Sequence, residues 1–172
     1  DRHADLLKYL ETWLPQEYQR LQQLQQRDKA PKKPLSKLQK KYEKSGIKRF
    51  VSKDGFDIWV GKTQEDNEEL VIRLARGNDL WFHLKGRPGA HVIVQLFKGK
   101  SAPLETMLDA AFLCAHYSGV RAGENADIDY TFRKNVKRIP GHGSARKFLV
   151  TYTQNKTLHV KVDEVRLKQL MG

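Results

Sequence analysis

Apolar residues recur along this chain with two different periods, which separates helical segments from strand segments. Over residues 1–27 they recur at steps of three and four, the spacing of one helix face. The residues that follow this spacing are Leu6, Leu10, Trp13, Leu14, Tyr18, Leu21 and Leu24. Proline fits the first turn of a helix and not its interior. Pro15 therefore predicts two helices that meet at Leu14, in a coiled-coil arm or a helical hairpin.

The next segment, residues 28–49, is strongly basic. Nine lysine and arginine residues and two acidic residues give it a net charge of +7. Leu35, Leu38 and Tyr42 have helical spacing, which predicts a short helix that ends at Gly46. We expect a basic linker that contacts phosphate groups, with a solvated charged surface as the alternative.

Strand patterns dominate from Ile47 onward. Short β-type runs at residues 49–52 and 56–60 flank the pair Asp54-Gly55. Asp-Gly favours a hairpin turn because both residues tolerate positive φ. The sequence therefore predicts a first hairpin here.

Two later segments have helical spacing. Residues 64–76 carry acids near their start and arginines near their end, which complements the helix dipole. Asn67 is the candidate N-cap of this helix and Gly77 its candidate C-terminal cap. Residues 103–117 form the second pattern, an amphipathic helix that we expect to end at Gly119 and to lie against the sheet.

Two apolar-rich runs at residues 79–84 and 91–96 form the pattern around which the chain is organised. Gly86 and the pair Pro88-Gly89 lie between them, so we expect a strand, a turn and a strand at the core of the sheet.

Polar and aromatic side chains are concentrated in this hairpin. Strand alternation places Asp79, Trp81 and His83 on one face of the first strand. Arg87 lies in the turn, and His91 opens the return strand. This set predicts a shaped binding patch; the alternative is that it only satisfies local backbone groups and fills the core. A nuclease or metal site is disfavoured because no ligand at the usual spacing completes it, so we expect neither an enzyme nor a cofactor.

The C-terminal part of the chain combines strand patterns with a basic stretch. Residues 127–133 alternate as in a strand, and the basic tract 133–138 continues from it. Residues 148–152 and 157–160 are expected to form a last hairpin, and residues 165–171 a short terminal helix.

Residues 133–147 hold six basic residues and no acid, and Gly141 and Gly143 allow the backbone to approach a phosphate closely. The basic residues that we expect to contact RNA phosphates are Arg133, Lys134, Lys137, Arg138, Arg146 and Lys147. The alternative is a positive edge strand that discourages aggregation. The aromatic side chains available to stack on unpaired bases are Trp59, Trp81, Tyr130 and Phe132.

Composition narrows the class of partner. Lysine and arginine total 32 against 20 acids, and a net charge of +12 indicates an anionic partner such as nucleic acid or an acidic membrane surface. Cys114 is the only cysteine, which excludes an intrachain disulfide and fits a reducing, cytoplasmic compartment. No run is long enough for a membrane span, no signal peptide is evident, and the start at Asp1 in mid-pattern indicates a fragment.

Four ordered blocks of the sequence resemble the NFACT-R domain, the C-terminal globular module of the NFACT proteins of ribosome-associated quality control. The blocks are residues 55–62, 79–83, 88–92 and 129–137, and the resemblance covers residues 48–162. The helical leader is also similar to family members, which place a coiled-coil arm before this domain. Ala90 departs from the pattern, since many relatives carry serine there.

The resemblance implies RNA binding at large ribosomal subunits that are blocked by peptidyl-tRNA. Full-length members recruit tRNA and extend the stalled chain, in bacteria with an alanine tail, and their N-terminal domain carries the residues most tied to tailing. The implied partners are therefore large-subunit RNA and tRNA, with no membrane, and the implied role is binding in stalled ribosome rescue. Bacterial members also bear an older label as fibronectin-binding proteins, so an adhesin that binds fibronectin is the alternative.

These patterns together predict an α+β fold, a mostly antiparallel sheet of hairpins backed by the helix at residues 103–117. Residues 1–46 are expected to form a helical coiled-coil remnant and basic linker, and residues 47–172 the globular domain.

Overall fold

Six strands form one antiparallel sheet in the computed structural model, which describes residues 2–27, 34–140 and 147–172. Their order across the sheet is β1-β2-β4-β3-β5-β8. The strands are β1 (Lys48–Val51), β2 (Asp57–Gly61), β3 (Leu80–Leu84), β4 (His91–Val94), β5 (Asn125–Phe132) and β8 (Lys156–Lys161). Two short strands, β6 (Val136–Arg138) and β7 (Val150–Tyr152), form a second antiparallel sheet. The predicted α+β fold with a mostly antiparallel sheet is confirmed.

Two of the predicted hairpins are confirmed. β1 pairs with β2, with Arg49 opposite Trp59, and the turn between them contains Gly55 at a φ of 85°. Positive φ carries no steric penalty for glycine, which explains this turn. β3 pairs with β4, with Trp81 opposite Ile93. These two strands occupy the middle of the sheet, so the hairpin at the centre of the sequence argument is also the centre of the fold.

The predicted last hairpin, residues 148–152 with 157–160, is wrong. β7 pairs with β6, whereas β8 pairs with β5, so the two segments belong to different sheets. The strand predicted at residues 127–133 also does not run on into the basic tract. β5 ends at Phe132, and a 3-10 turn at Arg133–Asn135 leads into β6. Local alternation identifies strands, but partners distant in sequence decide which strands pair.

The helix predicted at residues 64–76 is split and shorter. α4 (Gln64–Glu68) continues as a π-helical segment, η1 (Glu69–Leu74). The segment stops at Ala75, whose backbone is extended, and not at Gly77. The Ala75 backbone N–H bonds to the Leu70 carbonyl at 2.9 Å, which closes the wider π turn.

The N-cap of this helix is Thr63 and not Asn67. The Thr63 hydroxyl accepts a hydrogen bond from the Asp66 backbone N–H at 3.1 Å. Asn67 is buried instead, and its Oδ1 accepts a hydrogen bond from the His91 backbone N–H at 3.2 Å. A Cβ at Gly61 would lie 2.4 Å from that oxygen, so β2 needs glycine where the helix crosses it.

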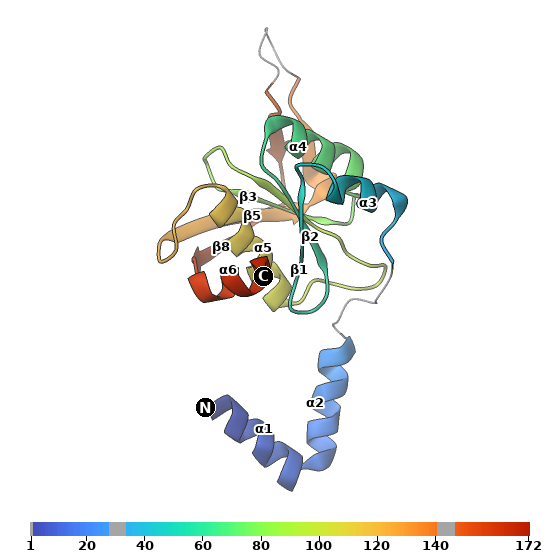
Figure 1. Cartoon of the computed structure of the whole chain (residues 1–172), viewed down its shortest axis with the longest axis vertical. Helices are drawn as coiled ribbons and strands as arrows, with labels where there is room; N and C mark the ends of the chain where they lie inside the picture. Colours follow the sequence, from blue (N-terminus) through green and yellow to red (C-terminus); the bar gives the residue numbers. More distant parts are fainter. Residues whose placement is uncertain (1, 28–33, 141–146) are drawn as a thin grey trace.

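Two helices, α5 (Leu104–Tyr117) and α6 (Glu164–Met171), cover one face of the sheet (Figure 1). They confirm the two helices predicted in these regions, and Gly119 follows α5 at a φ of 89°. Arg166 on α6 pairs with the buried Asp109 of α5 at 2.6 Å, which ties the helices together. The core beneath them includes Ile58, Val60, Phe82, Val92, Ala111, Leu113 and Ile128.

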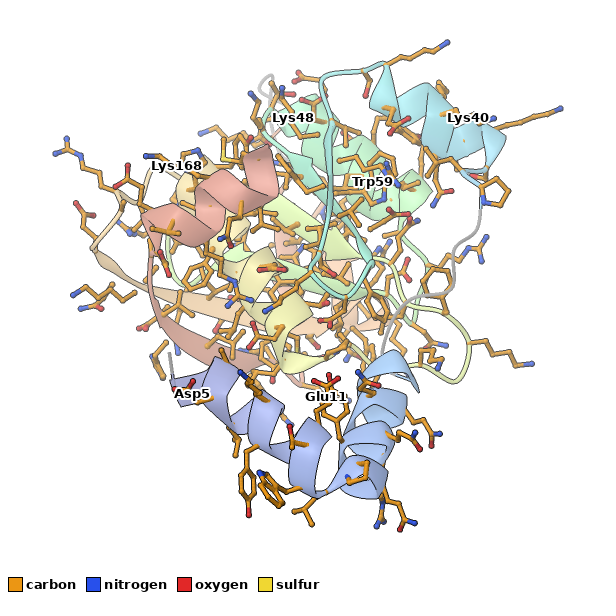
Figure 2. All side chains as sticks on the ribbon, turned by 60° about the horizontal axis from the view of Figure 1, so that its bottom comes forward. Asp5, Glu11, Lys40, Lys48, Trp59 and Lys168 are labelled. Carbon is orange, nitrogen blue, oxygen red and sulfur yellow. The ribbon has the colours of Figure 1, made fainter. Side chains whose placement is uncertain are left out.

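The opposite face is covered by α3 (Lys37–Glu43), by η1 and by the β6–β7 sheet. α3 confirms the predicted short helix and begins with a capping box between Ser36 and Gln39. Trp59 lies in the interior of this layer, whereas Lys40 of α3 is exposed to solvent (Figure 2). The second core between these elements includes Tyr42, Ile47, Trp59, Leu70, Val71, Trp81, Ile93, Val136 and Phe148.

Two further helices, α1 (Arg2–Trp13) and α2 (Pro15–Arg27), precede this globular part (Figure 1). They confirm the break at Leu14, with Pro15 as the first residue of the second helix. Large apolar side chains are exposed along α1, among them Trp13 at 70%. A coiled-coil arm stays a prediction. Over the described ranges, no helix combines the length and apolarity that a membrane crossing requires.

Candidate nucleic-acid interface

The first candidate region is a set of aromatic and imidazole rings on the face of β3 and β4 that lies away from α5. We call it the buried aromatic cluster, and it consists of Trp81, His83, His91, Phe148 and Tyr152. The centroids of contacting rings lie 4.7–5.6 Å apart. Trp81 and His83 share a face, as strand alternation predicted. Trp81 has no exposed surface and His91 is 5% exposed, so the cluster is part of the core.

A hydrogen bond defines the protonation state inside this cluster. Nε1 of Trp81 donates to Nδ1 of His91 at 3.0 Å. Because an indole only donates, Nδ1 carries no proton and the imidazole is neutral. Burial, and then the neighbouring His83, lowers the pKa of His91 to about 3. Burial also lowers the pKa of His83. Neutral imidazoles pack well in a core and carry no charge that attracts phosphate.

A buried carboxylate on β5 supports the cluster, and sequence reasoning missed it. Asp129 accepts hydrogen bonds from the hydroxyl groups of Tyr152 and Thr157, both at 2.6 Å. Burial, and then Asp129, raises the pKa of Tyr152 to about 12, so the phenol stays a donor. These bonds connect β7 and β8 to β5. The alternation of residues 127–131 was the available signal, since it puts Asp129 on the face opposite Ile128.

Asp79 lies apart from the cluster. Its carboxylate oxygens accept hydrogen bonds from the backbone N–H groups of Arg76 at 2.8 Å and Leu96 at 3.0 Å. Burial raises the pKa of Asp79, although both bonds oppose the shift. The carboxylate thus satisfies backbone groups, as the alternative interpretation proposed, and does not form a site with His83 and His91. Among the residues that the structure describes, no group of three His, Cys, Asp or Glu side chains is placed to hold a metal ion.

The turn between β3 and β4 holds the remaining member of the predicted patch. Arg87 is exposed there, and His83 is half-buried, whereas Asp79, Trp81 and His91 are buried. Direct contact of the last three with RNA stays a prediction that these buried positions do not favour. Ala90 follows the turn and is 2% exposed beneath α5, so a serine hydroxyl at this position would be buried.

The second candidate region is the basic stretch that runs through β6. We call its exposed part the cationic patch, and it consists of Lys134, Lys137, Arg138 and Lys147. Val136 is buried and Lys137 exposed, as alternation in a surface strand requires. Beyond β6, the Ile139 backbone N–H bonds to the Leu149 carbonyl at 2.8 Å, which brings Lys147 to the same end of the small sheet as Arg138. Arg138 pairs with Glu68 of α4 at 2.5 Å.

Arg133 differs from the other basic residues of this stretch. Its Nε donates to the Val71 carbonyl and its Nη1 to the Val136 carbonyl, the latter at 3.1 Å. The side chain is half-buried, and burial lowers the pKa of the guanidinium. Arg133 therefore joins η1 to β6, and its contact with phosphate stays a prediction. Arg146, also predicted, lies outside the described residues, as does the glycine loop.

Residues 47–147 match the family model described as "NFACT protein RNA binding domain". The chain is 32% identical over 133 residues to "Rqc2 homolog RqcH" of Streptococcus pneumoniae strain D39, covering 77% of this chain and 23% of that protein. It is 34% identical over 118 residues to "Rqc2 homolog RqcH" of Bacillus subtilis, covering 68% and 20%. It is also 32% identical over 93 residues to "Coiled-coil domain-containing protein 25" of Bos taurus, covering 51% and 44%.

A solved structure shares this fold. It is "The structure of the C-terminal of the fibronectin/fibrinogen-binding protein from Streptococcus suis (FBPS)", with a TM-score of 0.64 and 29% identity. The match covers 83% of this chain and 53% of that one. The chain spans less than a quarter of the length of the bacterial relatives named above.

Proposed function

The chain belongs to the NFACT protein RNA-binding domain family, and we propose that it is the RNA-binding module of a ribosome-associated quality control factor. In this proposal the full protein engages large ribosomal subunits blocked by peptidyl-tRNA and supports alanine tailing of the stalled chain. The module contacts large-subunit RNA or tRNA in the cytoplasm. It contributes affinity and position, and it catalyses no reaction.

The observation that carries this proposal is the cationic patch on and beside β6. Exposed lysine and arginine side chains neutralise phosphates and release counterions, and this supplies most of the affinity that does not depend on base sequence. Lys134, Lys137 and Lys147 are exposed, and Arg138 shares the patch with one acid, Glu68.

The buried aromatic cluster links the strand that carries part of the patch, β6, to the main sheet. Val136 of β6 lies opposite Tyr152 of β7, and the Tyr152 hydroxyl is bonded to Asp129 in the main sheet. β6 is therefore held at a fixed position by a strand that is itself anchored in the core. A rigid support of this kind fixes where the cations lie before RNA arrives, which reduces the ordering cost of binding.

The test is the affinity of the protein for purified large ribosomal subunits across a salt series. A variant with Lys134→Gln, Lys137→Gln and Arg138→Gln removes three cations from the patch. The matched control, Lys53→Gln with Lys161→Gln and Lys168→Gln, removes three exposed cations carried by other elements. Both triple variants include one ion-paired cation, since Lys168 pairs with Glu164 as Arg138 does with Glu68.

We expect the patch variant to bind more weakly and its salt slope to fall by about 2 to 3, because each lost phosphate contact removes about 0.7 to 0.9 from the slope. The control triple should keep the wild-type slope. Equal affinity and slope for the patch variant and the wild type would contradict the proposal.

A fibronectin-binding adhesin is the second candidate, and one observation favours it. The similar solved structure from Streptococcus suis is titled a fibronectin/fibrinogen-binding protein. Saturable binding to immobilised fibronectin, combined with no binding to ribosomal subunits at low salt, would support this candidate over RNA binding.

A further inference from the structure

A hollow lies at the ends of β3 and β5, outside both candidate regions. Its volume is ≈ 840 Å³, which is within the range of sites that take small ligands. One wall is the turn at residues 76–79 and the other is the turn at residues 96–102. Leu80 of β3, Met107 of α5, and Tyr130 and Phe132 of β5 complete the lining.

Asp79 builds this hollow by holding both walls. One carboxylate oxygen accepts the Arg76 backbone N–H at 2.8 Å, and the other accepts the Leu96 backbone N–H at 3.0 Å. The Asp79 backbone N–H also donates to the Arg76 carbonyl at 3.0 Å. In the second wall, Gly99 lines the hollow and has a φ of 74°, a backbone conformation that favours glycine. Asp79 is thus a positioning residue.

The lining combines cations with an accessible aromatic ring. Arg76, Lys98 and Lys100 line the hollow, and the acid among its lining residues, Asp79, has both oxygens bonded to backbone N–H groups. Phe132 is 41% exposed although it is a large apolar side chain at the end of a strand. An exposed ring bordered by cations is the combination that binds unpaired bases, because the ring stacks on the base and the cations contact its phosphates.

Lys134 connects the hollow to the cationic patch. Its backbone N–H donates to the Gly77 carbonyl in the first wall at 3.0 Å. Its ammonium nitrogen lies 5.2 Å from the centre of the Phe132 ring. Lys134 of the cationic patch therefore lies beside Gly77 and Phe132, two residues that line the hollow.

We propose that this hollow binds one unpaired nucleotide of the RNA that the cationic patch holds, with its base against Phe132 and its phosphates near Arg76, Lys98 and Lys134. This inference rests on the proposed RNA-binding function and adds a preference for RNA with single-stranded nucleotides. A fully paired duplex offers no free base and uses only the patch.

The test compares two RNA probes on the whole chain, a fully paired duplex and the same duplex with a single-stranded overhang. The wild type should bind the overhang probe about fivefold or more tightly, since stacking of one base on an aromatic side chain supplies a difference of that size. Phe132→Ala and Phe132→Leu should both lose this preference and keep the affinity for the duplex. Val51→Ala, which shortens a comparably exposed strand side chain elsewhere, is the control.

Each outcome separates this inference from the function on which it rests. If Phe132→Leu retains the overhang preference while its thermal unfolding midpoint equals that of the wild type, the nucleotide site is overturned. The proposed RNA-binding function is still supported in that case if the patch variant binds both probes more weakly than the wild type does. If the wild type binds neither probe at low salt, both proposals fail. The double variant Arg76→Gln with Lys98→Gln should bind the overhang probe more weakly and keep its affinity for the duplex.

Discussion

The buried aromatic cluster and the cationic patch are neighbours in the fold and opposites in their physical roles. They meet in the β6–β7 sheet, where Val136, which precedes Lys137 of the patch, pairs with Tyr152 of the cluster. The cluster is uncharged and packed, with Trp81, His91 and Phe148 buried and His83 and Tyr152 half-buried, whereas the patch is charged and exposed. Histidine, tryptophan and aspartate close together in a sequence do not by themselves make a binding surface. Here Trp81 and His91 pack beneath the β6–β7 sheet, and Asp79 bonds to the backbone of two turns.

The difference follows from what each group loses on burial. An indole or a neutral imidazole gains from leaving water once its polar atom has a partner. A lysine ammonium loses its hydration, and it therefore stays at the surface unless it is paired. The cluster should accordingly govern the stability of the fold, and the patch should govern the affinity for RNA. Variants can separate these two effects.

The largest expected effect is on the stability of the protein, through a substitution in the buried aromatic cluster. Trp81→Ala removes a fully buried indole and should lower the free energy of unfolding by about 3–5 kcal/mol, because a cavity remains in a close-packed core. Urea denaturation measures this. Trp13→Ala, at a tryptophan that is 70% exposed, is the matched control and should change stability by about 0.5 kcal/mol or less. Similar losses for both variants would break the distinction between buried cluster and surface.

A smaller effect is expected from the polar support of the cluster. Tyr152→Phe removes the hydroxyl that donates to Asp129 and leaves one buried carboxylate oxygen without that partner. The free energy of unfolding should fall by about 1–3 kcal/mol. Tyr9→Phe removes a hydroxyl from a tyrosine that is 55% exposed and should be neutral. If Tyr152→Phe were also neutral in urea denaturation, the anchoring of β7 through Asp129 would be wrong.

The third prediction uses pH and concerns the buried aromatic cluster. The pKa of His91 is about 3 in the folded state against an ordinary value of 6.5. The unfolded chain therefore binds a proton that the folded chain does not, between these two values. The contribution of neutral His91 to the free energy of unfolding is fully present above pH 6.5. It is lost as pH falls toward 3, by about a tenfold change in the unfolding constant per pH unit.

Urea denaturation of the wild type and of His91→Gln at pH 7 and at pH 5 measures this loss of stability. The variant should be less stable at pH 7 and should lose less on acidification than the wild type does. His83, whose pKa is also lowered, retains part of the pH dependence in the variant. His116→Gln, at an exposed histidine, should follow the wild-type slope. Equal slopes for all three proteins would show that His91 is not buried and neutral.

Local features of the fold were predictable because their causes lie within a few residues. The Asp54-Gly55 turn, the proline at the start of α2 and the spacing of α5 each follow from backbone geometry or helix periodicity. The N-cap at Thr63 was missed because Asn67 is the stronger capping residue by type alone. Its side chain is engaged instead by the backbone of His91, a contact between segments far apart in the sequence.

The candidate site was predicted only in its composition. The sequence identified the basic residues of the patch, but Arg133 is half-buried and its guanidinium donates to the carbonyls of Val71 and Val136. Asp129 was not singled out, since its partners Tyr152 and Thr157 come from two other strands. Asp79 was placed with the histidines by strand alternation, although it precedes β3 and bonds to backbone in two turns.

Most helices and strands, the strongly positive charge and the family resemblance can be read from the chain alone, because periodicity, turn chemistry and net charge are properties of neighbouring residues or of their sum. Only the tertiary structure decided which polar residues are buried and which are displayed. That outcome depends on strand pairing and on which partners reach each polar atom. β7 with β6, and β8 with β5, are pairings of distant segments, and they turned a predicted hairpin into the support of the cationic patch.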